Sequence, residues 1–223
     1  MTIYSGLIPD DFGDELELLC ARLETSSKTG PLAVRLSRHL LVSLAENLNR
    51  INNDSYSTSS PWEILALMNI LMGAEDLTEV EALVNVGEAD GHLWRIRSLL
   101  QQWVNLNLGA SKRGIESRHI FVIQDWLEFS ADEEAFLCAK RFAASGLQVK
   151  VVQRSALPIA IEGDQVTLRY AQIPSCSVKL EPDLGSSEFV VLKPVLSVEE
   201  VNNHRALFEI AWDSPGAVSL TAI

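Results

Sequence analysis

The spacing of apolar residues changes along this chain, and that change constrains its fold more than any other feature. Between Leu32 and Leu48, leucine recurs at every fourth residue, which is the spacing of a helix with one apolar stripe. From His119 onward, short apolar runs of β-branched and aromatic residues alternate with helical patterns, as in strands joined by helices. We therefore predict an α+β fold, with a helical N-terminal part followed by a mixed-sheet α/β C-terminal part.

Several helices are predicted in the first part of the chain. They cover residues 12–23, 31–51, 61–72, 76–87 and 90–108. The third begins most clearly, because Ser60 can cap it, Pro61 suits its first position and Glu63 completes a capping box. This helix is apolar nearly all round, so it is either the central core helix of the first part or an interface. The residues proposed for a partner interface on it are Trp62, Leu65, Met68 and Met72.

A stretch rich in glycine, serine and basic residues, 108–114, predicts a domain boundary. We expect a helical domain over 1–110 and an α/β domain over 115–223. In the second domain, strands at 120–123 and 147–152 flank a helix, which favours a parallel pair with a right-handed crossover. The other predicted elements are a helix over 131–145, a hairpin of 159–161 and 166–170, strands at 178–180 and 189–192, and a final helix over 197–212.

The charge and the cysteines suggest where the protein works. The chain of 223 residues has 30 acidic and 18 basic residues, which gives a formal charge of -12. Because attraction to a phosphate backbone needs positive charge, we expect nucleic acid not to be a partner. The three cysteines form no CxxC pair, and the N-terminus does not resemble a signal peptide, so we predict a cytoplasmic protein. The most apolar stretch, 64–72, is far shorter than the ~20 residues that cross a bilayer, so we expect no membrane association.

A search for catalytic and metal-binding motifs finds none. The sequence has no GxSxG, HExxH, GxxxxGK[ST] or GxGxxG, and its four histidines lack the spacing of metal ligands. We therefore predict no catalytic residue from motifs, no metal and no cofactor.

Two places remain as candidate ligand-binding positions. Asp125 and Trp126 follow the first predicted strand, and Arg154 follows the next, so all three belong to the edge where open parallel sheets bind ligands. Trp126 can stack on a ligand there, or it can pack under the following helix. The second place is the locally basic junction that ends at Arg118 and His119, which is either an anion contact or a linker with solvated charges.

The second part of the chain has a strand–helix–strand pattern over 119–152 and ends with an apolar run at 189–192 and a helix at 201–212. This pattern, over residues 118–214, resembles degenerate phospholipase D-like regulatory domains. Active members of that superfamily carry an HxK(x4)D motif, in which histidine attacks phosphorus and lysine stabilises the charge. No histidine of this chain has a lysine two positions later. The resemblance therefore implies a binding or sensing domain without that chemistry.

Three hypotheses about function follow. The first is a non-enzymatic regulatory or adaptor protein that binds a protein partner or a small ligand, with a homo-oligomer as a further form of assembly. The second is an enzyme with an unrecognised site at Asp125, Arg154 and His119, since reacting groups need only converge in space. The third is an acidic nucleic-acid-linked regulator, which requires acids lined up on one face. The missing catalytic motifs and the apolar helix at 64–72 favour the first.

Overall fold

The computed structural model describes residues 57–58, 60–86, 97–131, 133–161, 163–172, 174–182 and 190–220. The chain divides into two compact units, 1–56 and 57–223, and every described residue belongs to the second. The helices predicted over 12–23 and 31–51 lie outside the described residues, as does the start of the helix predicted from Asp90.

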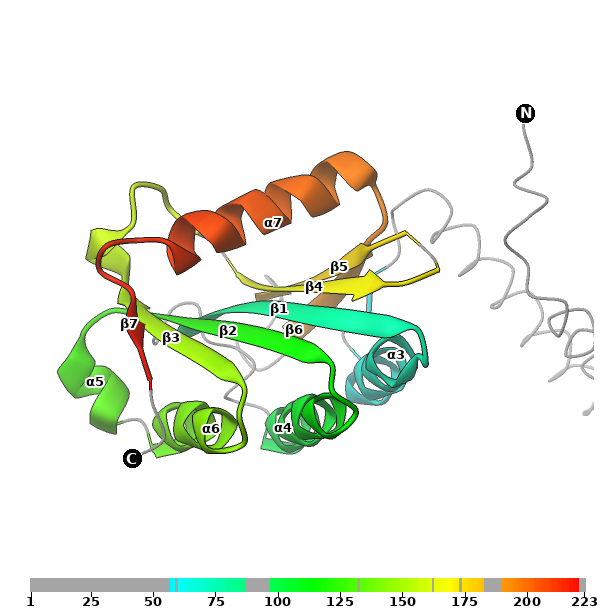
Figure 1. The fold of residues 1–223 in the computed structure, drawn as a ribbon, viewed down its shortest axis with the longest axis horizontal. Helices are drawn as coiled ribbons and strands as arrows, with labels where there is room; N and C mark the ends of the chain where they lie inside the picture. The colour runs from blue at the N-terminus through cyan, green and yellow to red at the C-terminus, as the bar shows by residue number, and fades with distance from the viewer. Residues whose placement is uncertain are drawn as a thin grey trace, which may run out of the picture. The chain divides into compact units, whose positions relative to one another are not determined.

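A seven-stranded mixed sheet forms the centre of this unit (Figure 1). Its strands are β1 (Leu77–Val86), β2 (Glu116–Ile123), β3 (Gln148–Gln153), β4 (Asp164–Tyr170), β5 (Cys176–Pro182), β6 (Val190–Val195) and β7 (Val218–Ser219). Their order across the sheet is β6-β5-β4-β1-β2-β3-β7. The strands β1, β2 and β3 are parallel to one another, and every other pairing is antiparallel. The predicted mixed sheet and parallel pair are thereby confirmed.

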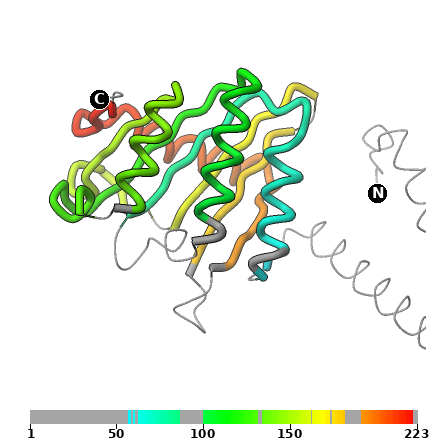
Figure 2. The backbone as a smooth tube through the Cα atoms, turned by 90° about the horizontal axis from the view of Figure 1, so that it is seen from below, coloured from blue at the N-terminus to red at the C-terminus, as the bar shows by residue number. Residues whose placement is uncertain are grey.

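Helices cover both faces of the sheet. They are α3 (Pro61–Gly73), α4 (Arg97–Lys112), α5 (Trp126–Ala131), α6 (Glu133–Ala144) and α7 (Val198–Trp212), with a 3-10 turn, η2, at Arg154–Ala156. The helices α3, α4 and α6 lie side by side on one face, and among the described helices only α7 crosses the other (Figures 1 and 2). None of the described helices is long and apolar enough to cross a membrane.

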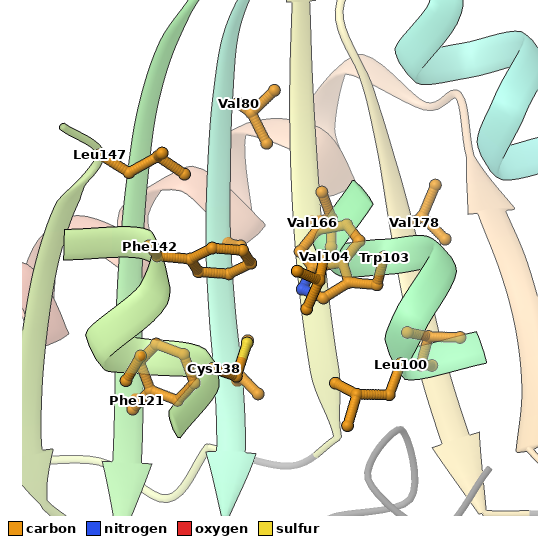
Figure 3. Packing of buried hydrophobic residues seen from close by; sticks show 14 of the residues in the cluster. Val80, Leu100, Trp103, Val104, Phe121, Cys138, Phe142, Leu147, Val166 and Val178 are labelled. Carbon is orange, nitrogen blue, oxygen red and sulfur yellow. The ribbon is translucent and has the colours of Figure 1, made fainter. Parts of the chain in front are cut away.

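The two faces of the sheet bury different amounts of apolar surface. The larger core lies under α3, α4 and α6, and Trp103, Phe121 and Phe142 are among its members (Figure 3). The smaller core lies under α7, where Phe208 and Ala211 pack against apolar side chains of β1, β2 and β3. Burial of apolar area is the main source of stability. The packing of α7 on the sheet therefore depends more on contacts other than apolar burial than the packing of α3, α4 and α6 does.

The prediction of a helix over 76–87 is wrong, because these residues form the central strand β1. All of β1 except Thr78 is buried, since helices cover the sheet on both sides. A short run buried on both faces has no clear period, so its β-branched residues favour a strand where the pattern alone does not. Glu79, which lies within the predicted helix, forms ion pairs with Arg118 and Arg169.

Two other predictions differ from the structure. The stretch 108–114 is not the division between the units; it ends α4 and turns into β2, with Gly114 at a φ of 79°. The predicted hairpin is also displaced, because β4 pairs with β5 and not with 159–161. The final helix is confirmed, since α7 covers Val198–Trp212.

Candidate functional site

A cluster of charged side chains lies between α7 and the sheet. We call it the α7 ion cluster, and its members are Glu79, Glu81, Arg118, Arg169, Arg205 and Glu209. Side chains alternate between the two faces of a strand, so Glu79 and Glu81 of β1 share the α7 face with Leu83, which belongs to the core under α7. The cluster therefore continues the apolar core beneath α7 as a charged layer.

Arg118 is the centre of the α7 ion cluster. Its Nη2 donates to Glu81, to Glu209 Oε1 at 2.7 Å and to Glu79 Oε1 at 3.5 Å. Its Nη1 donates to Glu209 Oε2 at 3.3 Å, so the guanidinium and the carboxylate of α7 meet in a two-bond pair. Arg205 contributes a second link, from its Nε to Glu81 Oε2 at 3.4 Å.

Two aromatic rings of α7 complete the surroundings of Arg118. Its guanidinium lies 5.0 Å from the ring centroid of Phe208 and 5.5 Å from that of Trp212. Lys150 approaches the same indole, with Nζ 4.5 Å from the ring centroid and 2.8 Å from the backbone oxygen of Trp212. Cations over aromatic faces are attracted by the ring quadrupole. The charged layer thus holds α7 to strands β1, β2 and β3.

Burial shifts the pKa values within this cluster. Glu81 is only 1 % exposed, and burial raises the pKa of its carboxyl although the charge of Arg118 opposes the shift. Burial by itself would lower the pKa of Arg118, but hydrogen bonds to Glu209 and the charge of Glu81 outweigh it and raise that pKa. Arg118 is therefore a permanent cation whose charge is matched by its neighbours, and not a group that exchanges protons.

A second polar cluster lies at the carboxyl ends of the parallel strands. The backbone N–H of Asn85, near the end of β1, donates to Asp164 Oδ1 at 2.7 Å. Arg154, which directly follows β3, donates from Nη2 to Asn85 Oδ1 at 3.0 Å. The Asn85 side-chain amide donates to the backbone oxygen of Gly163, whose φ is 68°. Asn85 and Asp164 are almost fully buried. These bonds therefore join β1, β3 and β4 at the carboxyl end of the parallel strands.

Asp125 and Trp126 lie at the start of α5, after β2. The carboxylate of Asp125 caps this helix, because its Oδ1 accepts from the backbone N–H of Leu127 at 2.7 Å and of Glu128 at 2.9 Å. The indole of Trp126 meets Phe129 edge to face at a centroid distance of 6.2 Å. Trp126 remains 37 % exposed, so it is neither fully packed under the helix nor freely projecting.

His119 lies on the opposite face of β2 from Arg118 and is completely buried. Its ring is 5.9 Å from that of Trp103 and 4.6 Å from that of Phe142, measured between centroids. Burial lowers the pKa of His119 to about 3, so the ring is neutral at any physiological pH. Adjacent residues of a strand point to opposite faces, which separates His119 from Arg118.

Of the residues predicted for ligand binding, Asp125, Trp126 and Arg154 do follow the carboxyl ends of the neighbouring strands β2 and β3, whereas Arg118 and His119 lie on opposite faces of β2. Arg118 belongs to the α7 ion cluster, His119 to the core on the other face, and Arg154 to the strand-end bonds with Asn85. Asp125 and Trp126 shape the start of α5. The sequence analysis did not identify Glu79 and Glu81 of β1 as functional residues. Their alternation with apolar residues would have indicated a strand with both acids on one face, but a helix was predicted there.

The predicted partner interface on α3 is largely part of the core. Met68 and Met72 are 5 % and 2 % exposed and pack against the sheet, and Leu65 is partly buried beside them. The side chain of Trp62 lies outside the described part of the structure. Of the two readings of this helix given by the sequence, the structure supports the core for Met68 and Met72. Among the described residues, no group of three histidine, cysteine or acidic side chains is arranged to hold a metal ion.

Similarity to known proteins is found among solved structures. No protein-family model matches the chain, and no curated protein matches it by sequence. Among solved structures it is similar to polyphosphate kinase from Porphyromonas gingivalis, with 12 % identity, a TM-score of 0.48, and coverage of 72 % of this chain but 26 % of that one. It is also similar to TrmBL2, an archaeal chromatin protein with a novel mode of DNA binding, with 12 % identity, a TM-score of 0.37, and coverage of 90 % and 66 %. With TM-scores below 0.5, neither likeness shows what this chain does.

The expectation that nucleic acid is not a partner needs correction. TrmBL2 is a DNA-binding chromatin protein, and the likeness to it contradicts an exclusion made on charge alone. The physical reason is that net charge averages over the whole chain, whereas phosphates are contacted by local groups of lysine and arginine. A net charge of -12 therefore does not exclude nucleic acid as a partner.

Proposed function

We propose that this chain is a non-enzymatic, cytoplasmic regulatory or adaptor protein that binds a protein partner through the end of the sheet at which α5 and α6 lie. We call this region the α5–α6 corner, and it consists of Trp126, Leu127, Phe129, Phe136 and Leu137. The observation that carries the proposal is the exposure of apolar side chains there, since Leu127 is 81 % and Leu137 60 % exposed. Exposed apolar side chains grouped on one region are a feature of interaction sites.

The α5–α6 corner is built on a firm support. Phe129 is 1 % exposed, and its ring meets Phe136 edge to face at 5.5 Å and Trp126 at 6.2 Å. The Asp125 cap holds the first turn of α5. A partner that binds this corner would lose little freedom in the corner itself, because the supporting rings are already ordered. Tryptophan is also enriched among residues that dominate binding energy.

The positions of the ionisable groups favour binding over catalysis. A general acid or base must reach the substrate and change its protonation near neutral pH. Asp125 caps a helix, Arg154 donates to the buried Asn85, and His119 is enclosed in the core with its pKa lowered to about 3. Asp125 and Arg154 are thus engaged in structural hydrogen bonds and His119 is closed to solvent, so the geometry does not support the enzyme hypothesis built on these three residues.

The resemblance to degenerate phospholipase D-like regulatory domains is part of this proposal. Polyphosphate kinase belongs to the phospholipase D superfamily, which agrees with the resemblance in fold class. A regulatory domain of this kind would bind without the HxK(x4)D chemistry. The motif is absent, because no histidine of this chain has a lysine two positions later.

A crosslinking pull-down with two matched variants tests the proposal. The tagged full-length chain is mildly crosslinked in its native lysate with and without nuclease, and the captured proteins are quantified by mass spectrometry. Leu127→Glu places a charge on the α5–α6 corner, whereas Ile70→Glu places the same charge on α3, where Ile70 is 68 % exposed. Both sites are exposed, so neither variant should lower the melting temperature appreciably.

We expect a stoichiometric protein that survives nuclease, is captured by the wild type and by Ile70→Glu, and is lost with Leu127→Glu. Equal capture by both variants would remove the α5–α6 corner as the binding surface. Recovery of nothing but the chain itself would refute the adaptor proposal, and capture that disappears with nuclease would show that nucleic acid bridges the two proteins.

A further inference from the structure

Buried polar atoms without a hydrogen-bond partner gather at one place in the core, between α4 and β2. They are Trp103 Nε1, Asn107 Oδ1, Ser117 Oγ, and both ring nitrogens of His119. All four side chains are deeply buried, with exposures of 2 %, 0 %, 5 % and 0 % in the same order. None of them takes part in the α5–α6 corner or in the α7 ion cluster, so they call for a separate explanation.

The geometry of the α4–β2 connection brings these four side chains together. The helix turns directly into the strand, since the N–H of Ile115 donates to the backbone oxygen of Ala110 at 3.1 Å. Asn107 lies ~9 Å back along the helix from this turn, and Ser117 ~10 Å forward along the strand. Trp103 and His119 lie ~15 Å and ~16 Å from it. Asn107 is thus level with Ser117, and Trp103 with His119.

One contact supports this alignment. The rings of Trp103 and His119 are 5.9 Å apart between centroids and meet edge to face. In Figure 3 the indole nitrogen of Trp103 lies on the side of the ring that faces Phe142, whose own ring lies 4.6 Å from that of His119 and is tilted against it by 43°. Asn107 is oriented by its own helix, because its amide Nδ2 donates to the backbone oxygen of Trp103 at 2.9 Å. Ser117 shares the strand face of His119, two positions away.

We propose that Trp103, Asn107, Ser117 and His119 enclose an internal binding site for ordered water. A buried polar group left without a partner is costly, so several in one place call for a bound polar molecule. The indole N–H and one imidazole N–H are donors, Asn107 Oδ1 and the other imidazole nitrogen are acceptors, and the Ser117 hydroxyl is both. A buried water makes two to four such bonds, and this set supplies them with both polarities.

Water fits this site better than an ion. His119 is neutral, and the other three side chains carry no charge, so the site offers no counter-charge to an anion or a cation. The site is also closed to solvent, because each of its side chains is at least 95 % buried. A water enclosed in this way exchanges slowly with the bulk, and that slowness is the property to be measured.

Water–protein NOE spectroscopy on the 15N-labelled full-length chain tests the proposal through the indole N–H of Trp103, assigned with a Trp103→Phe variant. We expect a cross-peak between this proton and water with the sign of a long-lived complex. The indole of Trp126, which is 37 % exposed, is the control and should show only the weak effect of rapidly exchanging surface water. A Trp103 indole without a water cross-peak would overturn the proposal.

Two further variants exclude other origins of the signal. Ser117→Ala removes the hydroxyl proton that could relay exchange, and the cross-peak should persist because three side chains of the site remain. Asn107→Leu removes an acceptor and fills its volume, and the cross-peak should fall to the noise. A scalar coupling across a hydrogen bond from the Trp103 indole to the His119 imidazole would also overturn the proposal, because the two groups would then satisfy each other directly.

Discussion

The buried histidine of β2 makes a quantitative prediction about stability and pH. His119 is fully buried, and its pKa in the folded chain is lowered to about 3 from a usual value of 6.5. The unfolded chain therefore binds a proton at this position first as the pH falls. The contribution of the neutral ring to stability is complete above pH about 6.5 and is lost progressively as the pH drops toward 3.

The magnitude follows from the size of this shift. Each pKa unit corresponds to 1.36 kcal/mol, and pH 5 lies about 1.5 units below the unfolded value. Lowering the pH from 7.5 to 5 should thus reduce the free energy of unfolding by about 2 kcal/mol through His119 alone. At pH 5 the folded ring remains neutral, so only the unfolded chain takes up the proton.

The assay is urea unfolding followed by tryptophan fluorescence. All five tryptophans lie beyond residue 56, so the signal reports the second compact unit without a contribution from the first. The wild type is compared with His119→Leu at pH 7.5, 6.5, 5.5 and 5. We expect the variant to lose about 2 kcal/mol less than the wild type between the extremes, whatever its absolute stability. His204 also has a pKa lowered mainly by burial, so a His204→Gln variant measures the second contribution. Equal losses in the wild type and His119→Leu would refute the reasoning.

Three other predictions rest on single contacts. Arg118→Met removes the cation that three carboxylates share, which leaves only Arg169 for Glu79 and Arg205 for Glu81, and should lower the free energy of unfolding by about 3–5 kcal/mol in urea titrations, whereas Lys193→Met, at an exposed pair, should cost less than about 1 kcal/mol. Gly163→Ala should destabilise the protein by more than Gly114→Ala, measured as melting temperatures, because both have positive φ but only at Gly163 would a Cβ lie 2.8 Å from a backbone oxygen of β5. The thiol of Cys138 should resist iodoacetamide at pH 8 until urea unfolds the chain, as peptide mapping would show, because burial raises its pKa to about 12; rapid labelling of the folded chain would contradict this.

The final helix and the strands β2 and β3 were predictable from the sequence, and the strand β1 was not. The final helix and the parallel strands β2 and β3 agree with the sequence analysis, since their apolar patterns and capping residues point to one structure. The strand β1 was mistaken for a helix because only Glu79 to Ala82 alternates between polar and apolar residues, whereas the rest of this strand, which is buried on both faces, does not. Its identity is decided by its neighbours in the sheet, β2 and β4, which lie far from it in sequence.

The sequence by itself determined the α+β class, the mixed sheet, and the lack of a recognisable catalytic motif, because these depend on local patterns of residue types. Only the tertiary structure decided where the functional groups lie. Arg118 and His119 are neighbours in sequence, yet one enters a charged cluster under α7 and the other an aromatic core under α4 and α6. A strand turns successive side chains to opposite faces, and what covers each face is set by segments distant in sequence, so adjacency along the chain says little about a shared site.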